Sequence, residues 1–222
     1  MSGAGGIQQG PVQFVPMDNI KDVKNQFKEK FNFKGVTTQG FKPKEQLEFL
    51  NKTGEAIQAW FDEYPAIKNH VNNATRITLK FENEARLILN RSGDKFKGNV
   101  LGVYDPGTSI RVAAKQQLFD GKITPGKFNS VEGMMPTLKH EIGHHLVGTR
   151  KKFISPAKWK KYYNEKGSKW FEKNISKYAA SDVEEGWCEM MGMATHSGGK
   201  EYLMGLNDKK LNQFLDILWD NK

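Results

Sequence analysis

Residues 137–148 read TLKHEIGHHLVG and contain the pattern H-E-x-x-H, in which His140 and His144 are four residues apart and Glu141 follows the first histidine. On an α-helix, residues four apart lie on one face with Cβ atoms ~6 Å apart, so both imidazoles can bind one zinc ion. Glu141 then lies beside them, where it can take a proton from a metal-bound water. Pro136 suits the first turn of this helix, which we expect at about 136–147.

A helix that carries these residues without a shared metal is the alternative. In a chain of this composition, chance matches to the pattern are expected on the order of 0.01 times, which disfavours that alternative.

A zinc site of this kind needs a third protein ligand. One extended pattern, H-E-x-x-H-x-x-G-x-x-H, requires glycine at position 147 and histidine at position 150. This chain has Val147 and Arg150 there. The other common solution is a glutamate on a second helix, further along the chain.

Residues 176–189 read SKYAASDVEEGWCE and supply three candidate glutamates. Ser181 and Glu184 have the spacing of a capping box, which predicts that a helix starts there and gives Glu184 a structural role. Glu185 and Glu189 are four residues apart on one face of that helix. We assign Glu185 as the third zinc ligand and Glu189 as an acceptor that orients a ligand imidazole. The alternative is two solvated glutamates on an exposed helix face.

Together, the two motifs resemble the gluzincin metallopeptidases. The pattern Y-A-x-S-x-x-E-E-x-x-x-E, which begins at Tyr178, is similar to the branch that contains the anthrax lethal factor catalytic domain and the metallopeptidase domains attached to phage minor head proteins. The resemblance covers about residues 75–195 and implies a zincin-like fold. It also implies that Tyr178, seven residues before Glu185, assists catalysis. The chain departs from the family at Gly186-Trp187-Cys188, where the family tends to have apolar or aromatic residues and alanine.

The order of elements predicts an α+β fold with a small mixed sheet and a mainly helical C-terminal half. We interpret residues 1–44 as a flexible N-terminal arm, with some helix near Ile20–Phe31, and residues 45–222 as a zincin-like metallopeptidase domain. Apolar residues at helical spacing predict a helix between Pro43 and Pro65, with Gly54 as a candidate break. Further strands are expected at about 77–81, 86–89, 99–104 and 109–113, with a turn at 105–108, and further helices within 156–175 and at about 182–195 and 207–220.

The formal net charge is +9, and nearly all of the excess lies between Arg150 and Lys177, where ten basic residues accompany two acidic ones. Aromatic residues alternate with the lysines of this segment. Such a segment can bind DNA or another polyanion, or it can form helices with aromatic core faces and lysine-covered outer faces. We favour the second interpretation and keep a polyanion as a candidate partner.

Composition excludes several other classes of site and location. The single cysteine, Cys188, excludes an internal disulfide and a multi-cysteine zinc site, and we expect it to be a small buried side chain. His145 points about 100° away from His144 on a helix, so we expect a structural role for it. No apolar run approaches the ~18 residues that span a bilayer, and no secretory signal is visible, which favours a cytoplasmic or virion-associated protein.

The expected activity is that of a zinc metalloendopeptidase acting on a protein or peptide. Glu141 would be the general base and Tyr178 a hydrogen-bond donor to the developing oxyanion. The resemblance to zincin-like folds implies that the substrate lies extended along a sheet edge, for which the strand at 109–113 is a candidate. Two alternatives remain: a phage- or virion-associated structural protein that retains a zincin-like zinc site with little activity, and a nucleic-acid-associated protein. The intact Glu141 argues against the first, because metal binding alone does not require it.

Overall fold

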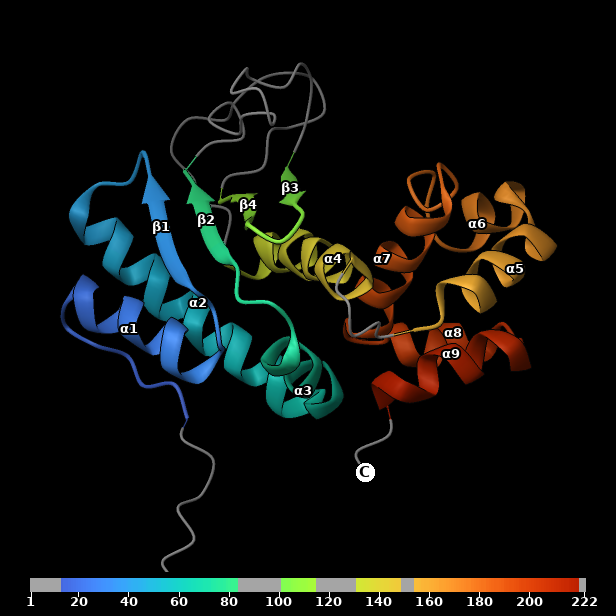
Figure 1. The fold of residues 1–222 in the computed structure, drawn as a ribbon, viewed down its shortest axis with the longest axis horizontal. Helices are drawn as coiled ribbons and strands as arrows, with labels where there is room; N and C mark the ends of the chain where they lie inside the picture. The colour runs from blue at the N-terminus through green and yellow to red at the C-terminus, as the bar shows by residue number, and fades with distance from the viewer. Residues whose placement is uncertain (1–12, 84–100, 115–130, 149–153, 220–222) are drawn as a thin grey trace, which may run out of the picture.

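Helix α4 (Val131–Gly148) lies in the middle of the molecule, between a sheet-containing half and a helical half (Figure 1). The computed structural model describes residues 13–83, 101–114, 131–148 and 154–219. Helices α1 and α2 lie in the half that contains the sheet, and α7 packs along the other side of α4. The helices are α1 (Ile20–Lys30), α2 (Pro43–Glu63), α3 (Pro65–Asn73), α4, α5 (Pro156–Lys166), α6 (Ser168–Asn174), α7 (Val183–Ala194), α8 (Gly199–Gly205) and α9 (Lys209–Trp219).

The described strands form one mixed sheet in the order β1-β2-β4-β3. Strands β1 (Gly35–Gln39), β2 (Thr78–Glu82) and β4 (Ser109–Ala113) are parallel, and β3 (Gly102–Asp105) pairs antiparallel with β4. The expected α+β fold with a small mixed sheet is therefore confirmed. The proposal that residues 109–113 form a sheet edge is wrong, because β4 lies between β2 and β3. Among the described strands, β3 is the edge strand that packs against α4.

The hairpin between β3 and β4 is confirmed. The backbone N–H of Thr108 donates to the carbonyl of Asp105 at 3.0 Å, and Gly107 has φ 71°. The ring of Pro106 fixes its own φ, and Gly107 follows it with a positive φ. Pro106 and Gly107 therefore suit the two central positions of a type II turn. The short strand expected at 86–89 lies outside the described residues.

Much of the segment interpreted as a flexible arm belongs to the folded body. The helix expected near Ile20–Phe31 is present as α1, which buries Val23 and Phe27, and β1 is the first strand of the sheet. Residues 1–12 lie outside the described residues. Strand β1 has little signature in the sequence, since Val36 is its one buried side chain and no alternation of buried and exposed residues is visible there.

Pro136 and Gly54 have positions that differ from the expectation. Helix α4 starts at Val131, so Pro136 lies inside the helix rather than in its first turn. Helix α2 continues through Gly54 without a break, and Pro65 also begins α3. The helices expected within 156–175 and near 182–195 and 207–220 are present, and α8 is an additional short helix.

The described aromatic residues of the basic segment belong to the core or pack against it. Trp159, Tyr162 and Phe171 are buried, and the Trp159 ring lies 5.3 Å from that of Trp187 on α7. The lysines of α5 at positions 158, 160 and 161 are exposed. These aromatic rings are therefore not available to stack on nucleic-acid bases. Across the described parts of the chain, no helix combines the length and apolar character needed to cross a membrane.

Candidate metal centre

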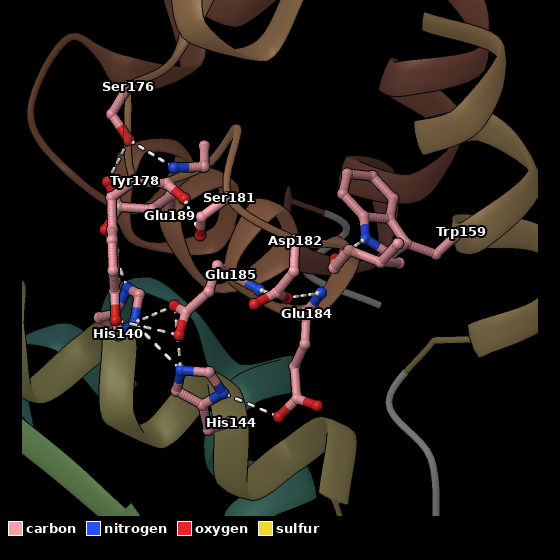
Figure 2. Close-up of polar contacts among 12 residues, drawn as sticks. His140, His144, Trp159, Ser176, Tyr178, Ser181, Asp182, Glu184, Glu185 and Glu189 are labelled. Carbon is pink, nitrogen blue, oxygen red and sulfur yellow. Dashed lines mark hydrogen bonds and ion pairs between the residues drawn. The ribbon is translucent and has the colours of Figure 1, made fainter. Parts of the chain in front are cut away.

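Helices α4 and α7 approach closely at Gly143 and Cys188. A Cβ atom on Gly143 would lie 3.2 Å from both the Cα and the Sγ of Cys188, which is tighter than ordinary packing. The glycine therefore lets the two helices come together without a side chain between them. As a result, the first turns of α7 lie over the histidines of α4 (Figure 2).

The first turn of α7 is capped by Asp182, not by Ser181. The Asp182 carboxylate accepts the backbone N–H groups of Glu184 at 2.8 Å and Glu185 at 3.0 Å. The Ser181 hydroxyl instead donates to the carbonyl of Tyr178 at 2.7 Å. The capping box predicted for Ser181 and Glu184 is therefore wrong. A carboxylate at the positive end of the helix dipole is a strong cap, and it leaves the Glu184 side chain free for another contact.

The three predicted zinc ligands converge on one point. Oε2 of Glu185 lies 2.9 Å from Nε2 of His140 and 3.3 Å from Nε2 of His144, and the two Nε2 atoms are 3.1 Å apart. In a tetrahedral zinc site with bonds of ~2.0–2.1 Å, ligand atoms are about 3.3 Å from one another. The chemistry and the spacing of this donor set therefore fit a zinc ion.

Each imidazole also has a carboxylate beside its other nitrogen (Figure 2). Nδ1 of His140 lies 2.9 Å from Oε1 of Glu189, and Nδ1 of His144 lies 2.8 Å from Oε1 of Glu184. These neighbours favour a proton on Nδ1, which leaves the lone pair on Nε2 for a metal. Glu189 thus occupies the position expected for an orienting acceptor. The contact of Glu184 was not anticipated, because the sequence suggested only a capping role.

Ser176 is a further residue that the sequence did not single out. Its hydroxyl donates to Oε2 of Glu189 at 2.7 Å and accepts the backbone N–H of Ala179 at 2.9 Å. It therefore fixes the carboxylate that faces His140. No spacing rule indicates this contact, since it depends on the turn that precedes α7.

The surroundings of the two imidazoles favour positive charge. Burial lowers the pKa of His140, but Glu185 and Glu189 outweigh burial and raise it to about 9. Burial likewise opposes ionisation of Glu185, yet the two histidines hold its pKa well below the ordinary range. The cluster thus needs positive charge at its centre, which either protons on the imidazoles or a metal cation can supply.

Glu141 lies against the edge strand β3. Its carboxylate is buried, which raises its pKa to about 7, and it receives a hydrogen bond from the backbone of Tyr104. A Cβ atom on Gly102 would lie 2.4 Å from Oε1 of Glu141. Gly102 therefore leaves the space that the glutamate occupies. A carboxyl group with a pKa near neutrality can both accept and return a proton.

Tyr178 lies at the exposed side of the cluster. Its hydroxyl donates to Oε1 of Glu185 at 3.0 Å, and its ring centroid is 5.5 Å from that of His140. The side chain is 55% exposed, so it borders the solvent-facing side of the three candidate ligands. Burial and Glu185 raise the pKa of its phenol, which keeps the proton available for donation.

Cys188 has the buried position that we expected, and His145 is buried as well. Burial lowers the pKa of His145 to about 4, and its ring packs 5.7 Å from that of Tyr104. The Sγ of Cys188 lies within 4.8 Å of a ring nitrogen of His140 and of His144. Burial raises the pKa of this thiol, however, and zinc binds the thiolate. Glu185, which is ionised and faces both Nε2 atoms, is therefore the better third ligand.

Comparisons of this chain with protein-family models, with curated proteins and with solved structures find no match. The resemblance to gluzincins therefore continues to rest on the two motifs.

Alanine substitutions should separate the roles of the three glutamates of α7. Glu185→Ala removes the oxygen that both Nε2 atoms face, so zinc affinity should fall most in this variant. Glu189→Ala and Glu184→Ala keep the ligand atoms but release one imidazole each, which should weaken binding on the order of 10–100-fold. Competition with a chromogenic chelator measures the three affinities.

The matched control is Glu172→Ala, which removes an exposed carboxylate on α6. It should leave zinc affinity unchanged. A Glu184→Ala variant that behaves like this control would mean that the contact with His144 does not orient the imidazole.

Proposed function

We propose that this chain is a zinc-dependent metallopeptidase in which His140, His144 and Glu185 hold the zinc. The observation that carries the proposal is the convergence of two imidazole Nε2 atoms and one carboxylate oxygen within 2.9–3.3 Å of one another. The motifs that resemble the gluzincins add support. A buried glutamate beside the cluster gives the arrangement a base as well as ligands.

When bound, zinc would act as a Lewis acid that lowers the pKa of a water molecule and polarises the carbonyl group of the substrate. Glu141 would accept the proton of that water and return it to the leaving amine, a role for which a pKa of about 7 is suited. Its hydrogen bond from the backbone of Tyr104 and its contact with Gly102 fix its direction. Tyr178 would donate from the exposed side to the oxygen on which negative charge develops.

The substrate would lie along β3, the edge strand next to α4, and not along β4 as the sequence suggested. An edge strand offers unpaired backbone groups to an extended peptide. Since Glu141 contacts the same strand, a peptide bound there would pass the base directly. The proposed substrate class is extended protein or peptide segments, bound along this edge.

The purified protein should carry about one zinc per chain, and His140→Ala or His144→Ala should abolish it. Glu141→Gln should keep the zinc and the fold but lower peptide turnover by about 10²–10⁴-fold, because the base is removed while the ligands stay. Metal analysis, circular dichroism and cleavage of a broad peptide library measure these outcomes. Unchanged turnover in Glu141→Gln would refute the mechanism. Zinc binding without turnover in the unsubstituted chain would favour the virion-associated structural alternative.

Gly102→Ala tests the position of the base without touching a ligand. The new methyl group would meet Oε1 of Glu141 at 2.4 Å and its Cγ at 2.8 Å, so the carboxylate must move. A displacement on the order of 1 Å can cost about 100-fold in turnover, while zinc content should stay at the level of the unsubstituted chain. The control is Gly192→Ala in α7, where an added Cβ meets nothing within 4 Å. Equal turnover in the two variants would contradict this account of Gly102.

Binding of DNA or another polyanion is a second candidate function, favoured by the exposed lysines of α5. Since the neighbouring aromatic rings are buried, such binding would rest on charge alone. The logarithm of affinity should then fall linearly with that of salt concentration, with a slope of about −0.9 per phosphate contacted. Replacing Lys158, Lys160 and Lys161 by Gln should flatten the slope, and replacing Lys21 and Lys24 on α1 should not. Absence of DNA binding at low salt would rule the function out.

A further inference from the structure

Residues 14–17 lie on α1 and α2 in the manner of a bound peptide. Gln26 accepts the backbone N–H of Val15 at 2.8 Å and donates to its carbonyl at 2.5 Å. Asn51 makes the same pair of contacts with the backbone of Met17, at 3.0 and 2.8 Å. Gln58 accepts the N–H of Phe14 at 3.0 Å. Three side-chain amides thus hold the backbone groups that an extended segment presents.

One side chain of the segment is held specifically. The ring of Phe14 is 5.8 Å from those of Phe27 and Phe31, edge-on to the first and stacked on the second. A Cβ atom on Gly54 would lie 2.1 Å from the ring, so the glycine supplies the space that the ring fills. Glycine inside a helix costs ~1 kcal/mol relative to alanine. The space that the Phe14 ring needs therefore explains why α2 contains Gly54, although glycine is unfavourable inside a helix.

Val15 contributes little beyond its backbone, since its side chain is 55% exposed. Recognition therefore combines amide contacts to the backbone, which any sequence could make, with one buried phenylalanine. The arm-docking face, as we name it, consists of Gln26, Phe27, Phe31, Asn51, Gly54 and Gln58. None of these contacts depends on the segment being joined to the same chain.

We propose that the arm-docking face is a peptide-binding site for extended segments with an anchoring phenylalanine, filled here by residues 14–17 of the same chain and open to the same segment of a second copy. The segment precedes α1 and is joined to it through Asp18 and Asn19. Helices α1 and α2, which form the face, also contact each other directly and not only through this segment. A link this short gives the tethered segment an effective concentration of about millimolar or more, so exchange between copies requires that the tethered segment be weakened or outcompeted.

A labelled synthetic peptide of residues 11–18, PVQFVPMD, stands for the segment of a second copy. The full-length Phe14→Ala chain, whose own segment lacks the anchor, should bind this peptide in a fluorescence anisotropy titration, and the unsubstituted chain should bind it at least about 10-fold more weakly. A peptide with alanine in place of Phe14 should bind about 10- to 100-fold more weakly than the parent peptide. A peptide with alanine in place of Val15 should bind as the parent does. Adding Gly54→Leu to the Phe14→Ala chain should remove binding, because the new side chain fills the space of the Phe14 ring.

Hydrogen exchange on the unsubstituted chain provides a test that does not depend on whether the Phe14→Ala chain folds. The amide protons of Val15 and Met17 are held by Gln26 and Asn51, and an excess of the parent peptide should accelerate their exchange. The peptide with alanine in place of Phe14 should not. The proposal is overturned if the folded Phe14→Ala chain binds neither peptide or binds both equally, or if the parent peptide leaves the exchange of both amides unchanged.

Discussion

The close crossing of α4 and α7 is the constraint on which the candidate metal centre depends. At Gly143 the backbone of α4 lies so near Cys188 that even a methyl group would be tight. This distance brings a carboxylate oxygen of α7 within 3.3 Å of both imidazoles of α4. A larger side chain at either position would separate the helices. Each helix would then keep its own motif, but the two motifs would no longer form one site.

The same crossing gathers negative charge that the protein must balance. Glu184, Glu185 and Glu189 all face the two imidazoles, and the buried Glu141 lies beside them. Burying carboxylates is costly unless they are paired with positive charge or hydrogen-bonded. The raised pKa values of both histidines show how strongly this surrounding favours a cation. The proposed zinc ion would meet that requirement while each imidazole keeps its proton on Nδ1, beside Glu189 or Glu184.

The parts of the site that the sequence could predict are those fixed within one helix. The relation of His140 to His144, and of Glu185 to Glu189, follows from the helical repeat alone. The contact of Glu184 with His144 could not be predicted, because it depends on how two helices cross. The position of β4 inside the sheet could not be predicted either, because strand order is a tertiary property that no spacing along the chain reveals.

Glycines mark several of the contacts that the spacing rules missed. From the sequence alone, Gly54 is a candidate helix break and Gly186 a departure from a family pattern. In the structure, a Cβ on Gly54 would meet the ring of Phe14, and a Cβ on Gly186 would lie 2.5 Å from the ring of Tyr163. Gly102 leaves space for Glu141 in the same way. None of these three has a left-handed backbone, so backbone freedom does not explain them. At these three positions the glycine marks space that a side chain from another part of the chain fills, so a glycine at such a position of a helix or strand already indicates a tertiary contact.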